Sequence, residues 1–152
     1  MNKYRTHNCN ELRKNDLDKK ISLSGWINKK RDHGNLLFVD LRDNYGLTQC
    51  VIDKDNKFFK QLEKTQLESV VKISGLVVER TKETINPDLN TGEIEIKIES
   101  MEILGLCNEL PMPVFSEQDY AEEIRLKYRF LDLRRKKIHE NIILRSRVIS
   151  FI

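Results

Sequence analysis

The order of strand-like and helix-like segments is the feature that most constrains the fold of this 152-residue chain. Strict alternation of apolar and polar residues predicts strands, whereas apolar residues at helical spacing predict a helix. Strands are expected at residues 21–30, 35–42, 47–53, 70–81 and 93–99. A helix that begins near Asp55 or Asn56 and carries Phe58, Phe59, Leu62 and Leu67 is expected between the third and fourth strands.

This order favours a closed five-stranded Greek-key barrel. An open five-stranded sheet would expose two unpaired edges, and closure hides them. The OB-fold is such a barrel, with its helix between strands three and four. We therefore predict an all-β OB-fold core over residues 1–105, with a short N-terminal helix capped by Asn8 or Asn10.

The chain changes character after Gly105. Residues 106–133 contain two prolines and little periodicity at their start, which is typical of a linker or hinge. Residues 134–152 have apolar residues at helical spacing and reach the last residue without a stop signal. An apolar stripe without a partner predicts that the sequence is part of a longer chain. The alternative is a terminal helix that packs back on the barrel.

Composition narrows the class of protein. Hydrophobic residues make up 39% and charged residues 34%, and the sequence has neither a long uncharged apolar run nor a signal-peptide core. We therefore expect a soluble protein without a membrane partner. The three cysteines, at positions 9, 50 and 107, have no metal-ligand spacing with one another or with the histidines. This pattern predicts a reducing, cytoplasmic setting and no structural metal.

Charge is distributed unevenly along the chain. Basic residues outnumber acidic residues nine to four through Asn35 and nine to two after Ile124, whereas acidic residues outnumber basic ones eighteen to nine between these points. Two basic ends are consistent with one positive surface for a polyanion. The alternative is that the charged runs solvate helix and loop faces.

Phe38 is the residue whose surroundings point to a ligand. Strand alternation places Leu37, Val39 and Leu41 on a core face and Phe38 on the opposite, polar face. Just before this strand lies the basic run Lys29, Lys30 and Arg31. An exposed aromatic ring can stack on an unpaired base while neighbouring cations hold the backbone. The alternative is a partly buried Phe38 covered by a loop.

Three stretches closely resemble the bacterial-type aspartyl-tRNA synthetases, a class IIb family. They are GWINKKRDHGNLLFVDLRDNYGLTQCVID, INPDLNTGEIEI and EEIRLKYRFLDLRRKKI. The related asparaginyl and lysyl enzymes share a version of YRFLDLR, so the combination of the first two stretches is the more specific. The resemblance implies an anticodon-binding domain at residues 1–105, a hinge at 106–133 and the first helix of a class II catalytic domain at 134–152.

The resemblance also implies roles for individual residues. Phe38 would stack on the central anticodon base, a uridine, and Gln49 would read its edge, because an amide both donates and accepts hydrogen bonds. Arg31 would contact the first two bases. Arg80 and Glu95 would lie near the third base, where a carboxylate can accept from the amino group of cytosine. Pattern alone would instead leave Glu95 as a solvated charge on an outer strand face.

Two positions depart from the family pattern. Thr84 stands where some members have asparagine, so Asn86 or another loop residue would make that contact. His33 stands where other members have leucine, and this histidine resembles the subgroup that charges both aspartate and asparagine tRNAs. Lys29 and Lys30 would contribute sequence-independent contacts to the RNA backbone.

The intact enzymes of this family use ATP and Mg²⁺ to form an aspartyl-adenylate, transfer the acyl group to tRNA and act as homodimers. Their three class II motifs, and the residues that bind ATP and aspartate, lie downstream of the stretch matched here. We therefore expect this chain to contain no catalytic or cofactor-binding residue, to lack aminoacylation activity and to be largely monomeric. The alternatives are a free-standing OB-fold protein that binds single strands without sequence preference and an interface role for residues 125–152.

Overall fold

The computed structural model describes residues 3–115 and 118–152. These residues form two compact units, of which the first ends at Asn108 and the second begins at Glu109. The two units are described separately below.

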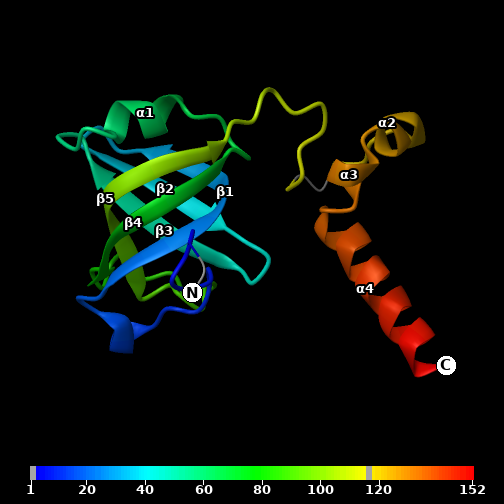
Figure 1. Cartoon of the computed structure of the whole chain (residues 1–152), viewed down its shortest axis with the longest axis horizontal. Coiled ribbons are helices and arrows are strands. Elements are labelled where there is room, and N and C mark those ends of the chain that lie inside the picture. The colour runs from blue at the N-terminus through cyan, green and yellow to red at the C-terminus, as the bar shows by residue number, and fades with distance from the viewer. Residues whose placement is uncertain (1–2, 116–117) are drawn as a thin grey trace. The chain divides into compact units, whose positions relative to one another are not determined.

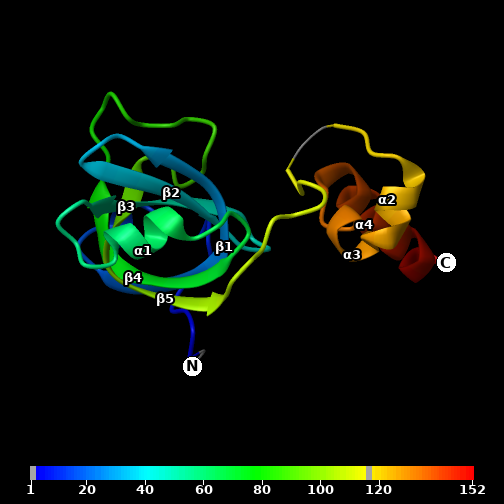
Figure 2. The ribbon, with the colours of Figure 1, turned by 90° about the horizontal axis from the view of Figure 1, so that it is seen from above.

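The first unit is a closed barrel whose five strands lie in the order β1-β2-β3-β5-β4 (Figure 1). The strands are β1 (Lys20–Asp32), β2 (Leu36–Arg42), β3 (Leu47–Asp53), β4 (Val70–Glu79) and β5 (Ile94–Gly105). Helix α1 (Phe59–Lys64) connects β3 to β4 and lies over one end of the barrel (Figure 2). Antiparallel pairing joins β1 to β2 and β4, β2 to β3 and β4 to β5, and a parallel pairing of β3 with β5 closes the barrel. The predicted OB-fold is confirmed.

The barrel core follows from strand alternation. The predicted core face of β2 is buried, because Leu37, Val39 and Leu41 are at most 2% exposed. Other strands contribute their inward residues in the same way, among them Leu23, Ile27, Cys50, Ile52, Ile73, Val77, Ile94 and Ile96. Burying each such aliphatic side chain contributes about 1.5–3 kcal/mol, so the core is the main source of the barrel's stability.

β5 extends six residues beyond the alternating stretch that predicted it. A register shift in the β4–β5 pairing lies between Ser74 and Gly75. At this shift the next buried residue of β5 after Ile98 is Met101, three positions later instead of two. An added Cβ on Gly75 would lie 2.1 Å from the carbonyl oxygen of Lys97, so glycine permits this close approach. The shift breaks the period-two pattern, and the sequence pattern therefore ended too early at Glu99.

The predicted short N-terminal helix is only a 3₁₀ helix, and its predicted cap at Asn8 or Asn10 was wrong. A single 3₁₀ turn, η1 (Lys14–Asp16), is present, and the residue that precedes it is Arg13. Asn10 instead adopts a left-handed conformation with φ of 73°, and its side-chain amide donates to the carbonyl of Tyr45 at 3.1 Å. Asparagine tolerates this conformation better than most residues, so it forms a turn rather than a helix cap.

Helix α1 begins close to the predicted position. The N–H of Phe58 donates to Oδ1 of Asn56 at 3.0 Å, while Nδ2 of Asn56 donates to the carbonyl of Ile98 at 3.0 Å. Asn56 therefore turns the chain into the helix, although Phe58 is the residue that directly precedes it. Leu67, expected on the apolar face, lies beyond the last helical residue and is 46% exposed.

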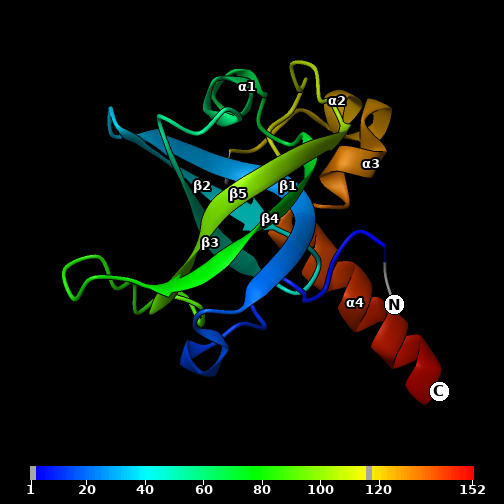
Figure 3. The same ribbon diagram turned by 60° about the vertical axis from the view of Figure 1, so that its left-hand side comes forward.

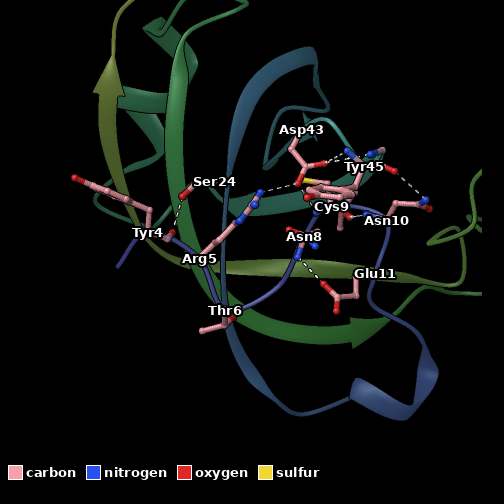
Figure 4. A network of polar contacts seen from close by, with 12 residues as sticks. Tyr4, Arg5, Thr6, Asn8, Cys9, Asn10, Glu11, Ser24, Asp43 and Tyr45 are labelled. Atoms are coloured by element: carbon pink, nitrogen blue, oxygen red, sulfur yellow. Dashed lines mark hydrogen bonds and ion pairs between the residues drawn. The ribbon is translucent and has the colours of Figure 1, made fainter. Parts of the chain in front are cut away.

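The N-terminal segment is fastened to the barrel through Asp43, in the turn after β2 (Figure 4). The Asp43 carboxylate accepts backbone N–H groups from Cys9 at 2.9 Å, Tyr45 at 2.7 Å and Gly46 at 3.1 Å. Nη1 of Arg5 donates to the same carboxylate at 3.3 Å. Because Asp43 is only 7% exposed, these donors depend on it rather than on water.

The cysteines differ in their exposure. Cys9 and Cys50 are buried, whereas Cys107 is partly exposed, and none of them is in a disulfide. Burial raises the pKa of the Cys9 thiol to about 12. Burial also raises the pKa of Cys50 well above its ordinary value.

The second unit contains α2 (Glu122–Lys127), α3 (Arg129–Asp132) and α4 (Lys136–Phe151). A small cluster of Met112, Val114 and Leu131 is buried within it. Asp132, which is fully buried, accepts from Nε of Arg125 at 3.1 Å and from Nη1 of Arg129 at 2.7 Å. The stretch predicted to be a linker thus carries two short helices and apolar contacts of its own. None of the helices in the described ranges is long and apolar enough to cross a membrane.

We expect the Asp43→Ala substitution to lower the free energy of unfolding by about 2–3 kcal/mol, because three backbone N–H groups lose their acceptor. Urea unfolding followed by the fluorescence of Trp26 measures this loss. Asp55→Ala removes a carboxylate from an exposed position and should change stability by less than about 0.5 kcal/mol. Equal unfolding midpoints for the two variants would contradict the anchoring role of Asp43.

Candidate functional site

Five polar side chains form a continuous row on the barrel. They are Arg31 on β1, Asp40 on β2, Gln49 on β3, Glu95 on β5 and Arg80 immediately after β4. We call this set the polar row. Strand register creates it, because Asp40 lies opposite Gln49 and the parallel pair Cys50 and Ile96 makes Gln49 and Glu95 neighbours.

Hydrogen bonds connect the first four members of the polar row, and an ion pair adds Arg80. Nη2 of Arg31 donates to Oδ1 of Asp40 at 2.7 Å and to Oε1 of Gln49 at 2.8 Å. Nε2 of Gln49 then donates to Oε2 of Glu95 at 2.8 Å, and Nε of Arg80 lies 3.9 Å from that oxygen. A guanidinium only donates hydrogen bonds and a carboxylate only accepts them. Arg31 and Glu95 therefore fix which end of the Gln49 amide is the oxygen and which is the nitrogen.

The polar row is largely withdrawn from water. Asp40 is 8%, Gln49 6% and Arg80 5% exposed, whereas the Arg31 side chain remains 38% exposed. Burial raises the pKa of Asp40, and the Arg31 cation opposes this shift. Burial lowers the pKa of Arg80, and the charge of Glu95 opposes it. Two cations and two carboxylates therefore offset one another at a site with little solvent.

The polar row keeps unused hydrogen-bonding capacity. Gln49 has a second amide N–H and a second oxygen lone pair beyond the bonds described above. Nε of Arg31 and Nη2 of Arg80 are buried and have no hydrogen-bond partner among the described residues. Unpaired buried donors are costly, and a ligand that carries acceptor atoms would relieve that cost.

Phe38 lies beside the polar row and on the same face of β2 as Asp40. It pairs with Arg31 across β1 and β2, and with Val51 across β2 and β3. The ring of His33 meets that of Phe38 edge to face, with 5.3 Å between centroids and an interplanar angle of 85°. Phe38 is therefore partly buried and contacts a loop residue, as one alternative from the sequence expected. It also borders the polar row, and stacking on a base stays a prediction.

The two lysines of the basic run have separate environments. Nζ of Lys30 donates to the carbonyls of Glu63 and Thr65, each at 2.6 Å, at the C-terminal end of α1. A cation there satisfies carbonyls that the helix leaves unpaired. The structure thus gives Lys30 an anchoring role at the end of α1, and its contact with the RNA backbone stays a prediction. A register shift in the β1–β2 pairing lies between Ile27 and Lys29. Lys29 is exposed and pairs with Asp40.

The loop between β4 and β5 projects from the barrel (Figure 3) and contains Asn86. Oδ1 of Asn86 accepts the N–H of Asp88 at 3.0 Å, and the Asn86 N–H donates to the carbonyl of Gly92 at 3.1 Å. Nη1 of Arg80 donates to the carbonyl of Thr84 at 3.3 Å, which links the loop to the polar row. Asn86 therefore shapes this loop and makes no hydrogen bond to the polar row within the described chain.

Asp40 is the member of the polar row that the sequence analysis did not select. Strand alternation places Asp40 on the same face as Phe38, and its partner Gln49 was selected on the next strand. A carboxylate on a face expected to bind a polyanion was the signal that could have identified it. In the described parts of the chain, no group of three or more His, Cys, Asp or Glu residues is arranged to hold a metal ion.

A family comparison now identifies the kind of domain. The model for the OB-fold nucleic acid binding domain matches residues 21–104, which is more than half of the chain. The chain belongs to this family. The polar row and Phe38 accordingly lie within the matched residues of an OB-fold nucleic acid binding domain.

Individual relatives match beyond the barrel. An aspartate–tRNA(Asp/Asn) ligase of Pelagibacter ubique is 76% identical over 152 residues, which is 100% of this chain and 26% of that protein. The enzyme of the same name from Zymomonas mobilis is 55% identical over 99% of this chain and 25% of its own length. The chain thus spans about a quarter of the length of the curated relatives that it matches.

A solved structure supports the same architecture. The asparaginyl-tRNA synthetase from Pyrococcus horikoshii, complexed with asparaginyl-adenylate, has a TM-score of 0.78 and 26% sequence identity to this chain. The match covers 95% of this chain and 32% of that protein.

We expect Lys30→Ala to lower the free energy of unfolding by about 1–2 kcal/mol, because carbonyls at the end of α1 lose a charged donor. Lys29→Ala removes a neighbouring exposed ammonium and should leave stability within about 0.5 kcal/mol of the original. Urea unfolding of both variants measures the difference. An unchanged stability for Lys30→Ala would argue against its anchoring of α1.

Proposed function

We propose that this chain is the anticodon-binding region of an aspartate–tRNA ligase and recognises the anticodon of aspartate tRNA. The observation that carries this proposal is the polar row, which joins Arg31, Gln49, Glu95 and Arg80 beside Phe38. The OB-fold family and the 76% identity to a ligase over the whole chain support it. They favour this function over that of a free-standing single-strand-binding protein.

The central anticodon base would be read by Phe38 and Gln49 together. Bases in a single-stranded loop can be splayed out and stacked on an aromatic ring, as the position of Phe38 would allow. The spare N–H of Gln49 can donate to O4 of uracil, and its spare lone pair can accept from N3–H. Because neighbours fix the amide, Gln49 offers this donor and acceptor in one order.

The third base would be read by Glu95. Its Oε2 atom is engaged by Gln49 and faces Arg80, which leaves Oε1 for the amino group of a cytosine. Arg80 reduces the repulsion that an isolated carboxylate would exert on phosphate. We propose that His33, in contact with Phe38, broadens recognition to asparagine tRNA. The names of the ligases from Pelagibacter and Zymomonas, which specify both tRNAs, support that proposal.

Aminoacylation is a proposal for the whole enzyme. The whole enzyme would use ATP and Mg²⁺ to activate aspartate and would act as a homodimer in the cytoplasm. We propose that these ligands bind outside the 152-residue chain, which is expected to be monomeric and to bind tRNA without charging it. A charging assay on the chain and on the whole enzyme tests this division.

We expect Phe38→Ala to weaken binding of an aspartate anticodon stem-loop by about 1–3 kcal/mol, the usual contribution of base stacking on an aromatic ring. Titration calorimetry or fluorescence anisotropy measures the change in Kd. Phe130→Ala removes an aromatic ring that is 66% exposed in the second unit and serves as the matched control. Equal affinities for the original chain and for Phe38→Ala would exclude the stacking role.

Matched stem-loops with the anticodons GUC, GUU and GAC separate the readers of individual bases. We expect GUC to bind about tenfold or more tightly than GAC, because Gln49 is matched to a central uridine. Similar affinities for GUC and GUU would agree with recognition of both tRNAs, whereas a marked loss for GUU would assign the chain to aspartate tRNA alone. Equal binding of all three would overturn base recognition by the polar row.

A further inference from the structure

We propose that Asp40 is a positioning residue that acts through Arg31 to hold the Gln49 amide in the orientation that selects a uridine over a cytidine. This inference rests on the function proposed above. Asp40 would not itself contact the base.

The geometry assigns Asp40 to this task. It lies within β2, directly opposite Gln49 in the register, and is 8% exposed. Nη2 of Arg31 carries two hydrogens, and its two acceptors are Oδ1 of Asp40 and Oε1 of Gln49. The same nitrogen atom therefore links the carboxylate to the amide, so a displacement of Arg31 would reach Gln49 directly.

The charge of Asp40 indicates that it does not contribute affinity. A carboxylate on a face that binds RNA repels phosphate, and a residue chosen for affinity alone would be neutral or basic. Arg31 is long, flexible and 38% exposed in its side chain, so it can otherwise turn toward any phosphate. A charge-assisted hydrogen bond at 2.7 Å restrains it. Asp40 would therefore lower the general affinity for RNA and hold Arg31 in a defined position.

The orientation of Gln49 decides which pyrimidine it matches. Uracil presents an acceptor at position 4 and a donor at N3, whereas cytosine presents a donor at position 4 and an acceptor at N3. Rotating an amide by half a turn exchanges its oxygen and nitrogen and so reverses its preference. Arg31 opposes this rotation on one side of Gln49, and Glu95 opposes it on the other. Loosening Arg31 should therefore relax discrimination between uridine and cytidine.

The experiment compares the Kd values of stem-loops with the anticodons GUC and GCC, which differ by one pyrimidine. We expect Asp40→Asn to reduce the preference for GUC about tenfold, with GCC bound more tightly than by the original chain. Asp53→Asn is the matched control, because it removes one negative charge at the end of β3, where Asp53 lies 3.0 Å from Nζ of Lys97. It should strengthen both complexes alike and leave their ratio unchanged.

Substitutions of Arg31 test whether Asp40 acts through it. In an Arg31→Ala background, Asp40→Asn should leave the ratio of the two Kd values unchanged. Arg31→Lys keeps the charge but removes the planar fork, and it should lower the preference as Asp40→Asn does. Thermal unfolding verifies that each variant is folded, and Arg31→Lys tests the link even if Asp40→Asn does not fold.

The outcomes separate the two proposals. An original chain that binds GUC and GCC equally would overturn the proposed reading of the central base. An original chain that prefers GUC, together with an Asp40→Asn variant of the same preference, would overturn the inference about Asp40 alone. A further loss caused by Asp40→Asn in the Arg31→Ala background would also overturn it, because Asp40 would then act by another route.

Discussion

The short parallel pairing between β3 and β5 is the contact on which both the barrel and the polar row depend. It consists of two residue pairs, Cys50 with Ile96 and Val51 with Lys97. Without it the strands would form an open sheet with exposed edges. In a parallel register the residues that precede the first pair, Gln49 and Glu95, are also neighbours. The contact that closes the fold therefore also completes the polar row.

In the proposed function, the polar row would favour selectivity over affinity. Hydrogen bonds within the protein hold the Gln49 amide and one oxygen of Glu95, so the donors and acceptors left for a ligand point in fixed directions. A ligand with the opposite pattern would place donors against donors and acceptors against acceptors, and would bury them without hydrogen bonds. That penalty is larger than the gain from a correct match, which is how buried polar sites reject close analogues.

Most of the fold could be predicted from the sequence, because one buried face on each strand produces a period of two. The predictions failed where a local irregularity changed that period. The shift between Ser74 and Gly75 interrupts the alternation along β5, so the second half of that strand was not predicted. Asp40 was missed for a different reason, because its proposed role depends on Arg31 and Gln49, which lie on the two adjacent strands. Sequence spacing gives the face of a residue but not the atom that it contacts.

The contrast among the three cysteines has a practical consequence for labelling. The thiolate is the form of cysteine that attacks thiol reagents, and burial with a raised pKa leaves Cys9 and Cys50 almost entirely as thiols at neutral pH. Cys107 is partly exposed and lies one residue before the end of the first unit at Asn108. A maleimide dye or a spin label would therefore attach at the junction of the two units without any cysteine being replaced. The sequence thus provides its own attachment point for a single probe near the end of the barrel unit.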